Sequence, residues 1–341
     1  MRVYRPRRAR IAGTGAYLPA RVVTNEELVA GGVPLTADEI VRLSGIRSRR
    51  WAAPDEATSD LAAAAGRAAL DRSGRADVER VVLATVSPDH PSPATACLVQ
   101  HRLGLPQVPA YDVSAACSGF LFALDAAARA VDTGDEAVLA IAADVRSRFL
   151  DPSDRATCAL FGDGAGAAVV TSGAPNLAGI ALASDGSGAG SVMVPAGGSR
   201  EPASLETVTL RRHTIRMADG AQVYFQAVEG MAAMAGALLT DLGMRVADVD
   251  LVVPHQANKR ILDRVARVLG VAEERVVVNV DRVGNISGAT VPVALDEALR
   301  AGRAPAGSRV LLLAAGAGHT AAAALLVVDE ELAGRYVPAG G

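Results

Sequence analysis

A cysteine, a histidine and an asparagine could together carry out chemistry at a carbonyl group. Cys117 lies within residues 115–119, between a predicted strand and the first turn of a predicted helix. Unpaired amides and the helix dipole at such a position favour a thiolate, so we expect a pKa depressed by about one or two units from about 8.5. We therefore predict a nucleophile at Cys117, although most intracellular cysteines are small buried hydrophobes.

The other two residues are candidates for stabilising negative charge. His255 directly follows a predicted buried strand at residues 251–253, so its imidazole would emerge at the end of a sheet. There it could partner the thiolate or donate to a developing oxyanion. Asn285, within residues 283–288, has an amide that donates without titrating. Asparagine also tolerates left-handed turns, so a purely structural role stays open at this position.

An internal duplication predicts how these residues are positioned. The Ser-Gly pair at residues 118–119 matches the pair at 287–288, and each follows a β-rich run and precedes an alanine- and leucine-rich segment at helical spacing. The β-rich runs are residues 108–113 and 276–280. We expect two halves, residues 1–175 with the cysteine and residues 176–341 with the histidine and asparagine.

Alternating strands and helices predict an α/β fold with mostly parallel sheets covered by helices on both faces. Residues 310–328 carry no charge and approach the length of a membrane span, but Gly316, Gly318 and the polar residues beside them interrupt the middle. We therefore predict two buried strands joined by a tight turn. The glycine-rich residues 184–216 break the alternation and are predicted to be a long insertion.

Composition excludes several classes of protein. The chain has 341 residues, of which 50% are hydrophobic and 21% charged, with a net charge of −3. Such a chain folds, and it has no basic excess for nucleic acid or an anionic membrane surface. Three cysteines without CxxC spacing argue against disulfides or a metal site and for a reducing, cytoplasmic compartment, with Cys97 and Cys158 structural. The first nine residues are interpreted as a solvated arm, and the glycine-rich loops lack a dinucleotide fingerprint.

The spaced motifs resemble the β-ketoacyl-acyl-carrier-protein synthase III group of the thiolase superfamily. The similarity runs from about Arg10 to Asp329. Five segments carry it in order: residues 11–19, 115–120, 162–166, 254–258 and 284–287. The resemblance implies a five-layer αβαβα sandwich built from two duplicated halves, usually a homodimer. It places the chain in the cytoplasm, among enzymes that initiate fatty acid or polyketide chains without a cofactor.

The resemblance also implies roles for individual residues. Cys117 would take an acyl group from a thioester, while His255 and Asn285 stabilise the enolate formed when malonyl carrier protein loses carbon dioxide. Backbone amides of Cys117 and Ala317 would form the oxyanion hole. Arg155 and Asn258 match positions that contact coenzyme A, and Arg260 with Lys259 would dock an acidic acyl carrier protein. An ordinary solvated helix start is the alternative for the last pair.

Several positions depart from the family pattern. Glu39, Leu43 and Ala221 replace a tryptophan, an arginine and an asparagine that hold coenzyme A in relatives. We therefore expect the acyl donor to be held differently or to arrive on a carrier protein, as in secondary metabolism. Ser92 replaces a bulky aromatic residue of the acyl pocket, which predicts a longer or branched acyl group. His319 replaces an aromatic residue, and the sequence assigns it no role.

Three related classes of protein share parts of this sequence pattern. A synthase III-like acyltransferase would pass the acyl group to a hydroxyl or amine, and the altered coenzyme subsite keeps this alternative open. A thiolase needs a second cysteine in the carboxyl-terminal half, where this chain has none. A non-catalytic partner subunit would have lost the nucleophile, so the presence of Cys117 argues against it.

Overall fold

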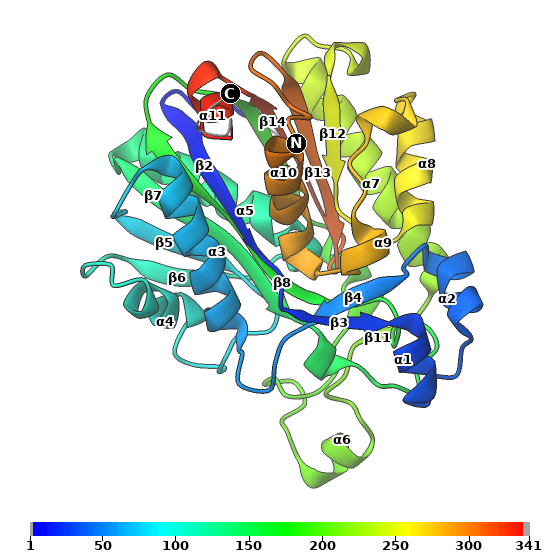
Figure 1. Cartoon of the computed structure of the whole chain (residues 1–341). Helices are drawn as coiled ribbons and strands as arrows, with labels where there is room; N and C mark the ends of the chain where they lie inside the picture. The colour runs from blue at the N-terminus through cyan, green and yellow to red at the C-terminus, as the bar shows by residue number, and fades with distance from the viewer. Residues whose placement is uncertain (1–2, 337–341) are drawn as a thin grey trace.

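Two five-stranded sheets lie at the centre of the computed structural model, which describes residues 3–336 (Figure 1). In spatial order, the first sheet contains β2 (Ala9–Tyr17), β8 (Asp163–Ser172), β7 (Ala137–Val145), β5 (Arg80–Ala84) and β6 (Ala110–Val113). The second contains β1 (Val3–Tyr4), β9 (Leu177–Ala183), β14 (Thr320–Val327), β13 (Arg309–Gly316) and β12 (Leu251–Pro254).

Helices fill three layers around these sheets, in the expected αβαβα order. Helices α3 (Thr58–Ser73) and α4 (Thr95–Arg102) cover the outer face of the first sheet. Helices α5 (Gly119–Thr133) and α10 (Thr290–Arg300) lie between the two sheets. Helices α7 (Gly220–Asp241) and α8 (Lys259–Leu269) cover the second sheet. The five-layer sandwich predicted from the sequence is thereby confirmed.

Smaller elements complete the chain. They are β3 (Arg21–Thr24), α1 (Asn25–Ala30), α2 (Ala37–Ser44), β4 (Ser48–Trp51), β10 (Val192–Met193), α6 (Leu205–Thr209), β11 (Arg216–Met217), α9 (Val280–Val283) and α11 (Glu330–Gly334). The predicted insertion at 184–216 contains only short elements, and α6 protrudes from the body (Figure 1). The proposed boundary between the halves falls between β8 and β9, although β1 crosses it by pairing with β9.

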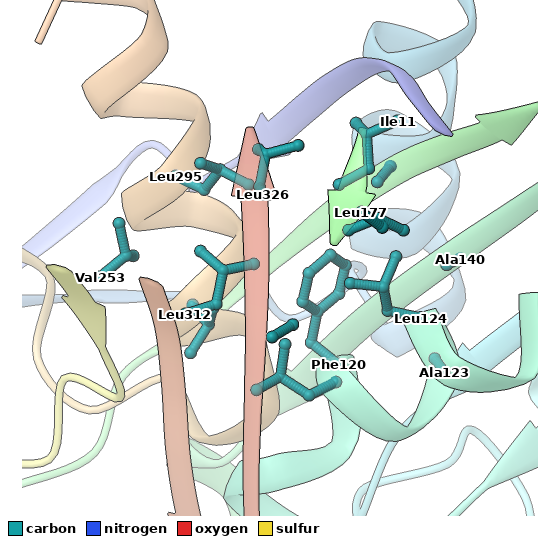
Figure 2. Close-up of a cluster of buried hydrophobic side chains, with 14 of the residues drawn as sticks. Ile11, Phe120, Ala123, Leu124, Ala140, Leu177, Val253, Leu295, Leu312 and Leu326 are labelled. Carbon is teal, nitrogen blue, oxygen red and sulfur yellow. The ribbon is translucent and has the colours of Figure 1, made fainter. Parts of the chain in front are cut away.

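The largest apolar core lies in the middle layer and joins the two halves (Figure 2). Phe120 and Leu124 of α5 face side chains of both sheets, among them Ile11 of the first sheet and Leu312 of the second. All four are at most 1% exposed. Because each helix of this layer is apolar on both sides, neither half could bury its inner sheet face without the other.

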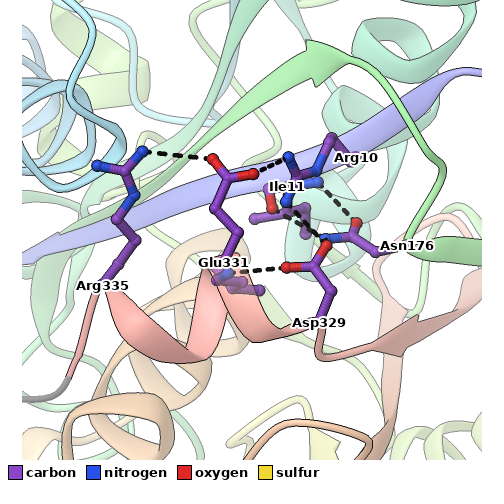
Figure 3. Close-up of polar contacts among 7 residues, drawn as sticks. Arg10, Ile11, Asn176, Asp329, Glu331 and Arg335 are labelled. Carbon is purple, nitrogen blue, oxygen red and sulfur yellow. Dashed lines mark hydrogen bonds and ion pairs between the residues drawn. The ribbon is translucent and has the colours of Figure 1, made fainter.

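A polar cluster closes the edge of the same interface (Figure 3). The Asn176 amide pairs with both backbone groups of Ile11, at 2.8 and 3.0 Å. Asp329 accepts from Asn176 and from Arg10, each at 2.9 Å, and Glu331 of α11 also pairs with Arg10. Strand β2 is therefore tied to the start of β9 and to α11.

The sheets are mixed, so the prediction of mostly parallel sheets is wrong. Only β5–β6, β5–β7 and β12–β13 are parallel among the eight neighbouring pairs in the two described sheets. The reason is visible in β13 and β14, which pair in register from Arg309↔Val327 to Gly316↔Thr320. A strand that returns after so short a turn must run antiparallel. The two buried strands predicted within residues 310–328 are confirmed.

Residues 276–280 do not form the predicted strand. They make one isolated bridge, between Val276 and Val252, before α9 begins at Val280. The fully buried Gln256 side chain occupies the neighbouring backbone groups: its amide donates to the Val277 carbonyl, and its oxygen accepts from the Asn279 and Val280 amides. A side chain thus replaces the ladder that a neighbouring strand would supply.

The amino-terminal residues are not a solvated arm throughout. Strand β1 pairs antiparallel with β9, and the Tyr4 hydroxyl donates to Asp132 at 2.9 Å. Arg5, Arg7 and Arg8 are exposed, as expected, but the Arg7 and Arg8 amides also donate to Asp132. Met1 and Arg2 lie outside the described residues.

Two glycine substitutions test how closely β2 approaches α3. A Cβ on Gly15 would lie 2.4 Å from the Ala69 nitrogen and 2.5 Å from the Ala65 carbonyl oxygen, which are backbone atoms of α3. We expect Gly15→Ala to lower the free energy of unfolding by about 2 kcal/mol. The exposed Gly236, within α7, has open space around it, so Gly236→Ala should raise stability by about 0.5–1 kcal/mol. Chemical denaturation of both variants measures the difference; equal effects would contradict the close approach.

Candidate active site

One cavity of about 650 Å³ opens between the halves, and the three predicted catalytic residues all line it. Cys117 comes from the first half, and His255 and Asn285 come from the second. Arg155, Asn258, Ala317, Leu43 and His319 also line it. Glu39, Ser92, Ala221, Lys259 and Arg260 are not among the lining residues. Ser92 lies in an exposed loop before α4, so the structure of one chain does not bring it to the cavity.

Cys117 sits in a tight turn, η1 (Ala116–Ser118), which runs directly into α5. Ala116 has a φ of +47°, and the first residue of the turn η6 (Ser287–Ala289) before α10, Ser287, has a φ of +52°. His319 has a φ of +46° and also faces the cavity. Each such conformation costs about 1–3 kcal/mol, and strain of this kind is concentrated at functional sites.

The two turns match with a shift relative to the sequence prediction. Because Ala116 and Ser287 both begin their turns at positive φ, Cys117 is the equivalent of Gly288. The predicted pairing of the two Ser-Gly dipeptides is therefore wrong by two residues. Asn285 comes from the segment before its turn and reaches the same cavity from there.

The end of β13 approaches the nucleophile from the second half. A Cβ on Gly316 would lie 2.7 Å from the Cys117 amide nitrogen, so only glycine fits. Thr320, at the start of β14, donates to the Ala115 carbonyl at 3.1 Å and accepts through its own carbonyl from Ser118 at 3.3 Å. Ala317 therefore lies beside the Cys117 turn, as the proposed oxyanion hole requires.

Burial reverses the expected protonation of the cysteine. Cys117 is partly accessible through the cavity, yet burial raises the pKa of its thiol to about 11, against the opposing effects of the Ser287 hydroxyl and the Arg146 charge. The Ser287 hydroxyl lies 3.9 Å from the sulfur. The expectation of a depressed pKa was wrong because loss of hydration outweighs the helix terminus. The raised pKa favours the thiol over the thiolate, so the proton must leave as the substrate reacts.

His255 is neutral and oriented by a hydroxyl group. It is 2% exposed, and burial lowers the pKa of its imidazole to about 3. Its Nδ1 lies 2.6 Å from the Thr290 hydroxyl, which can also donate to the Ser287 carbonyl at 3.0 Å, so the two acceptors compete for one proton. The hydroxyl has one proton, so Nε2 carries a proton only when Thr290 donates to Nδ1. Thr290 therefore determines whether His255 can donate into the cavity.

Backbone hydrogen bonds fix the position of Asn285 in the chain. The backbone N–H of Asn285 donates to the Leu160 carbonyl at 2.9 Å, and the backbone carbonyl of Asn285 accepts from the Gly162 amide at 3.0 Å. Its side-chain oxygen accepts from the Ser287 amide at 2.9 Å. With the oxygen engaged there, the side-chain NH₂ group is left to donate into the cavity. Two neutral donors, from His255 and Asn285, can thus serve one oxygen atom.

Comparison with known proteins identifies the family of the chain. Residues 111–186 match the model of 3-oxoacyl-[acyl-carrier-protein (ACP)] synthase III, and residues 239–328 match the model of its C-terminal part. A β-ketoacyl-[acyl-carrier-protein] synthase III from Solibacter usitatus is 43% identical over 327 residues, covering 93% of this chain and 98% of the relative. The chain belongs to the β-ketoacyl-acyl-carrier-protein synthase III family.

Solved structures of synthase III enzymes share the whole fold. The 3-oxoacyl-(acyl carrier protein) synthase III of Pseudomonas aeruginosa PAO1 superposes with a TM-score of 0.87 at 38% identity, covering 95% of this chain and 99% of that one. The priming β-ketosynthase from the R1128 polyketide biosynthetic pathway gives 0.86 at 37% identity, covering 96% and 99%. Both agree with the fold class and with an acyltransferase of the condensing type.

The cavity mouth differs from what the synthase III pattern predicts. Arg155 lines the mouth, where its guanidinium donates to the Pro34 carbonyl and lies 3.4 Å from Glu39. Asn258 caps the start of α8 by accepting from the Ile261 amide at 2.9 Å. Lys259 pairs with Asp263, while Arg260 stacks on Tyr224 with 5.9 Å to the ring centre.

His319 joins the cavity to the insertion. Its ring lies over Gly188, where a Cβ would come within 1.7 Å of it, and its Nε2 lies 3.4 Å from the Ser191 hydroxyl. The Asp185 amide donates to the His319 carbonyl at 3.3 Å. This histidine therefore packs the start of the 184–216 insertion against the cavity wall.

Three residues that act at or behind the synthase III site were missed by sequence reasoning. Thr290 orients His255, Ser287 contacts the thiol, and Arg146 is a buried cation in the wall. The positions of Thr290 and Ser287 next to Asn285 were a usable signal. Arg146 gave none, because its burial depends on elements distant in sequence.

Within residues 3–336, no group of three or more His, Cys, Asp or Glu side chains is placed to hold a metal ion. Helix α7 is long and apolar enough to span a membrane by length and composition alone. It packs against the second sheet through Val228, Met231, Ala235 and Leu238, which are at most 4% exposed. That packing places one face of α7 in the core.

The raised pKa of Cys117 predicts how the thiol reacts with iodoacetamide. A thiol with a pKa of about 11 forms on the order of 10²-fold less thiolate at neutral pH than a free thiol with a pKa of about 8.5. Alkylation of Cys117, followed by peptide mass mapping, should be slow and should still be rising at pH 9.5. The exposed Cys97 provides an internal reference. A rate that levels off below pH 8 would show that the helix terminus outweighs burial.

Substitution of Thr290 tests its control of the His255 tautomer. Thr290→Val removes the hydroxyl that contacts Nδ1 and frees the His255 tautomer, so condensation should slow by about tenfold or more while acylation of Cys117 changes little. Thr290→Ser keeps the hydroxyl and should restore condensation. Single-turnover rates of the two half-reactions separate these effects. Equal losses in both half-reactions, or no rescue by serine, would point to a structural role only.

Proposed function

We propose that this chain performs both half-reactions of a decarboxylative condensation at the cavity. In the first, the Cys117 sulfur attacks the carbonyl carbon of an acyl thioester. A carbon–sulfur bond forms to Cys117, the bond to the donor's sulfur breaks, and the donor leaves as a free thiol that carries the Cys117 proton. The amides of Cys117 and Ala317 stabilise the oxyanion of the tetrahedral intermediate.

In the second half-reaction, malonyl carrier protein enters the same cavity. Its carboxylate leaves as carbon dioxide, and the electron pair of the broken bond forms an enolate whose oxygen accepts from His255 and Asn285. The enolate carbon then attacks the acyl group on Cys117, so that a carbon–carbon bond forms and the carbon–sulfur bond breaks. The Cys117 sulfur leaves as a thiolate and takes a proton from the solvent, and a β-ketoacyl product leaves on the carrier protein.

The observation that carries this proposal is the orientation of the Asn285 side chain. Its oxygen accepts from the Ser287 backbone amide at 2.9 Å, which leaves its NH₂ group free for the cavity that holds Cys117 and His255. Transfer of an acyl group needs a nucleophile and an oxyanion hole, but it needs no second pair of donors for an enolate. Two oriented neutral donors therefore favour condensation over simple acyl transfer.

Mass spectrometry of the intact protein tests the proposed activity. With acyl thioesters, the wild type should gain an acyl mass on Cys117, and malonyl carrier protein should remove it to give a β-ketoacyl product. Asn285→Ala should still acquire the acyl group but should condense about 10²-fold more slowly. An adduct that persists with malonyl carrier protein but transfers to a hydroxyl or amine would identify an acyltransferase instead.

The mouth of the cavity favours a carrier protein as acyl donor. Glu39 places a carboxylate against Arg155, whose charge would otherwise meet the phosphates of coenzyme A. Exposed arginines at 260, 264 and 267 follow one face of α8, at the cavity edge. An acidic carrier protein could dock on this stripe with its pantetheine arm in the cavity.

A homodimer, cytoplasmic location and a role in starting polyketide chains complete the proposal. Strand β6 is an edge strand of the first sheet, so its free backbone groups can pair with a second copy. Ser92 lies in the loop before α4, and α4 packs against the edge strand β6. Its effect on acyl length therefore remains a prediction about the assembled enzyme. No resident cofactor enters either half-reaction.

Substitution of Glu39 tests the choice of donor. Glu39→Gln keeps the hydrogen bond that caps α2 at Thr36 but removes the charge beside Arg155. The KM for acyl-coenzyme A should fall by about threefold to tenfold, whereas the KM for an acyl-pantetheine without phosphates should not change. Asp38→Asn, at the exposed neighbouring position, is the matched control. Tight binding of acetyl-coenzyme A by the wild type would argue against a carrier-bound donor.

A further inference from the structure

Arg146 places a positive charge in the wall of the cavity that holds Cys117. The residue is 7% exposed, and it follows the carboxyl end of β7. One Nη donates to the Val86 carbonyl at 3.1 Å, while the buried Nε has no partner. Among residues 3–336, no carboxylate forms an ion pair with this guanidinium; the described ion pairs of the cavity region engage Arg155, Arg211 and Arg216 instead.

The surroundings of Arg146 compensate its charge only in part. The guanidinium lies 5.5 Å from the ring centre of Phe149 and 5.8 Å from that of Phe161. The buried Asp144 is the acidic group of the same strand, but its oxygens accept from Thr85, Val86, Ser87 and Gly288. Arg146 is thus a buried cation without an ion-pair partner among the described residues, in the wall of the cavity that also holds the nucleophile.

A buried cation of this kind discriminates between acyl groups. A hydrocarbon chain in this part of the cavity would displace water from the guanidinium and leave the charge uncompensated. A hydroxyl or ketone oxygen would accept a hydrogen bond but would not balance the charge. A carboxylate does both, and it fits the two parallel N–H groups of a guanidinium.

We propose that the acyl group loaded on Cys117 is a carboxyacyl group, the monothioester of a dicarboxylic acid, whose distal carboxylate pairs with Arg146. This proposal rests on the proposed function, since it names the substrate class of the same loading step. It also narrows the longer or branched acyl group predicted from Ser92, because an acyl chain without a carboxylate offers Arg146 no charged acceptor.

The carboxylate of the malonyl group is the other source of the same chemistry. That group loses its charge as carbon dioxide departs, so a guanidinium bound to it would stabilise the ground state more than the transition state. Such a contact would slow the step. The distal carboxylate of the acyl group on Cys117 keeps its charge throughout the reaction. We therefore assign Arg146 to this acyl group and not to the malonyl group.

Loading rates with matched thioesters test the proposal. Succinyl- and glutaryl-pantetheine are compared with 4-methylpentanoyl- and 5-methylhexanoyl-pantetheine, which have the same shape without the charge. The acyl mass on Cys117 is followed with time. The wild type should load the carboxyacyl groups at least about tenfold faster than the neutral isosteres.

Two variants attribute the preference to Arg146. Arg146→Leu should remove or invert the preference, and Arg146→Lys should keep part of it. Arg148→Leu, two residues further on, is the matched control, because Arg148 is exposed and hydrogen-bonded to backbone carbonyls outside the cavity. If Arg146→Leu does not fold, the wild-type panel and Arg146→Lys still decide.

The outcomes separate this proposal from the proposed function. Neutral isosteres that load as fast as carboxyacyl groups in the wild type, or a preference that survives Arg146→Leu, would overturn the carboxyacyl assignment. If Arg146→Leu leaves the loading preference unchanged but alters the release of carbon dioxide from malonyl carrier protein, Arg146 binds the malonyl group instead. No adduct on Cys117 from any thioester would instead overturn the proposed function.

Discussion

The active site depends on the close approach of two backbone segments, the turn at Cys117 and the end of β13. Gly316 permits this approach, because any side chain there would collide with the Cys117 amide. Thr320 and Ser118 join the segments by hydrogen bonds. The apolar middle layer, which both halves need in order to bury their sheets, holds the approach in place. The nucleophile of one half and the donors of the other half therefore lie in the same cavity in this structure.

Burial then determines the electrostatics of the site. It keeps both Cys117 and His255 uncharged before substrate arrives, through a raised pKa for the thiol and a lowered pKa for the imidazole. Charge appears only on the reacting atoms, where oriented neutral donors are most effective because no competing water surrounds them. Arg146 is a permanent charge in this cavity wall, so it bears on which acyl groups are accepted rather than on the reaction common to all of them.

Much of this arrangement could be predicted from the sequence. Cys117 and His255 stand at the ends of apolar runs, which are local patterns. The internal duplication predicted that these strand ends lie close together. The direction of β14 was not predictable from composition, because the tight turn after β13 decides it. Residues 276–280 have β propensity, but the Gln256 side chain takes their hydrogen bonds. The protonation of Cys117 and the isolation of Arg146 depend on burial by distant segments, which no local pattern reveals.

The central claim is that acyl groups leave Cys117 through a carbon–carbon bond formed by decarboxylation. The most direct measurement counts products in one turnover of pre-acylated enzyme with malonyl carrier protein that is radiolabelled in its free carboxyl group. The account predicts one labelled carbon dioxide and one β-ketoacyl carrier protein for each acyl group lost from Cys117. Loss of the acyl group without labelled carbon dioxide would contradict it and would show that this chain only transfers acyl groups.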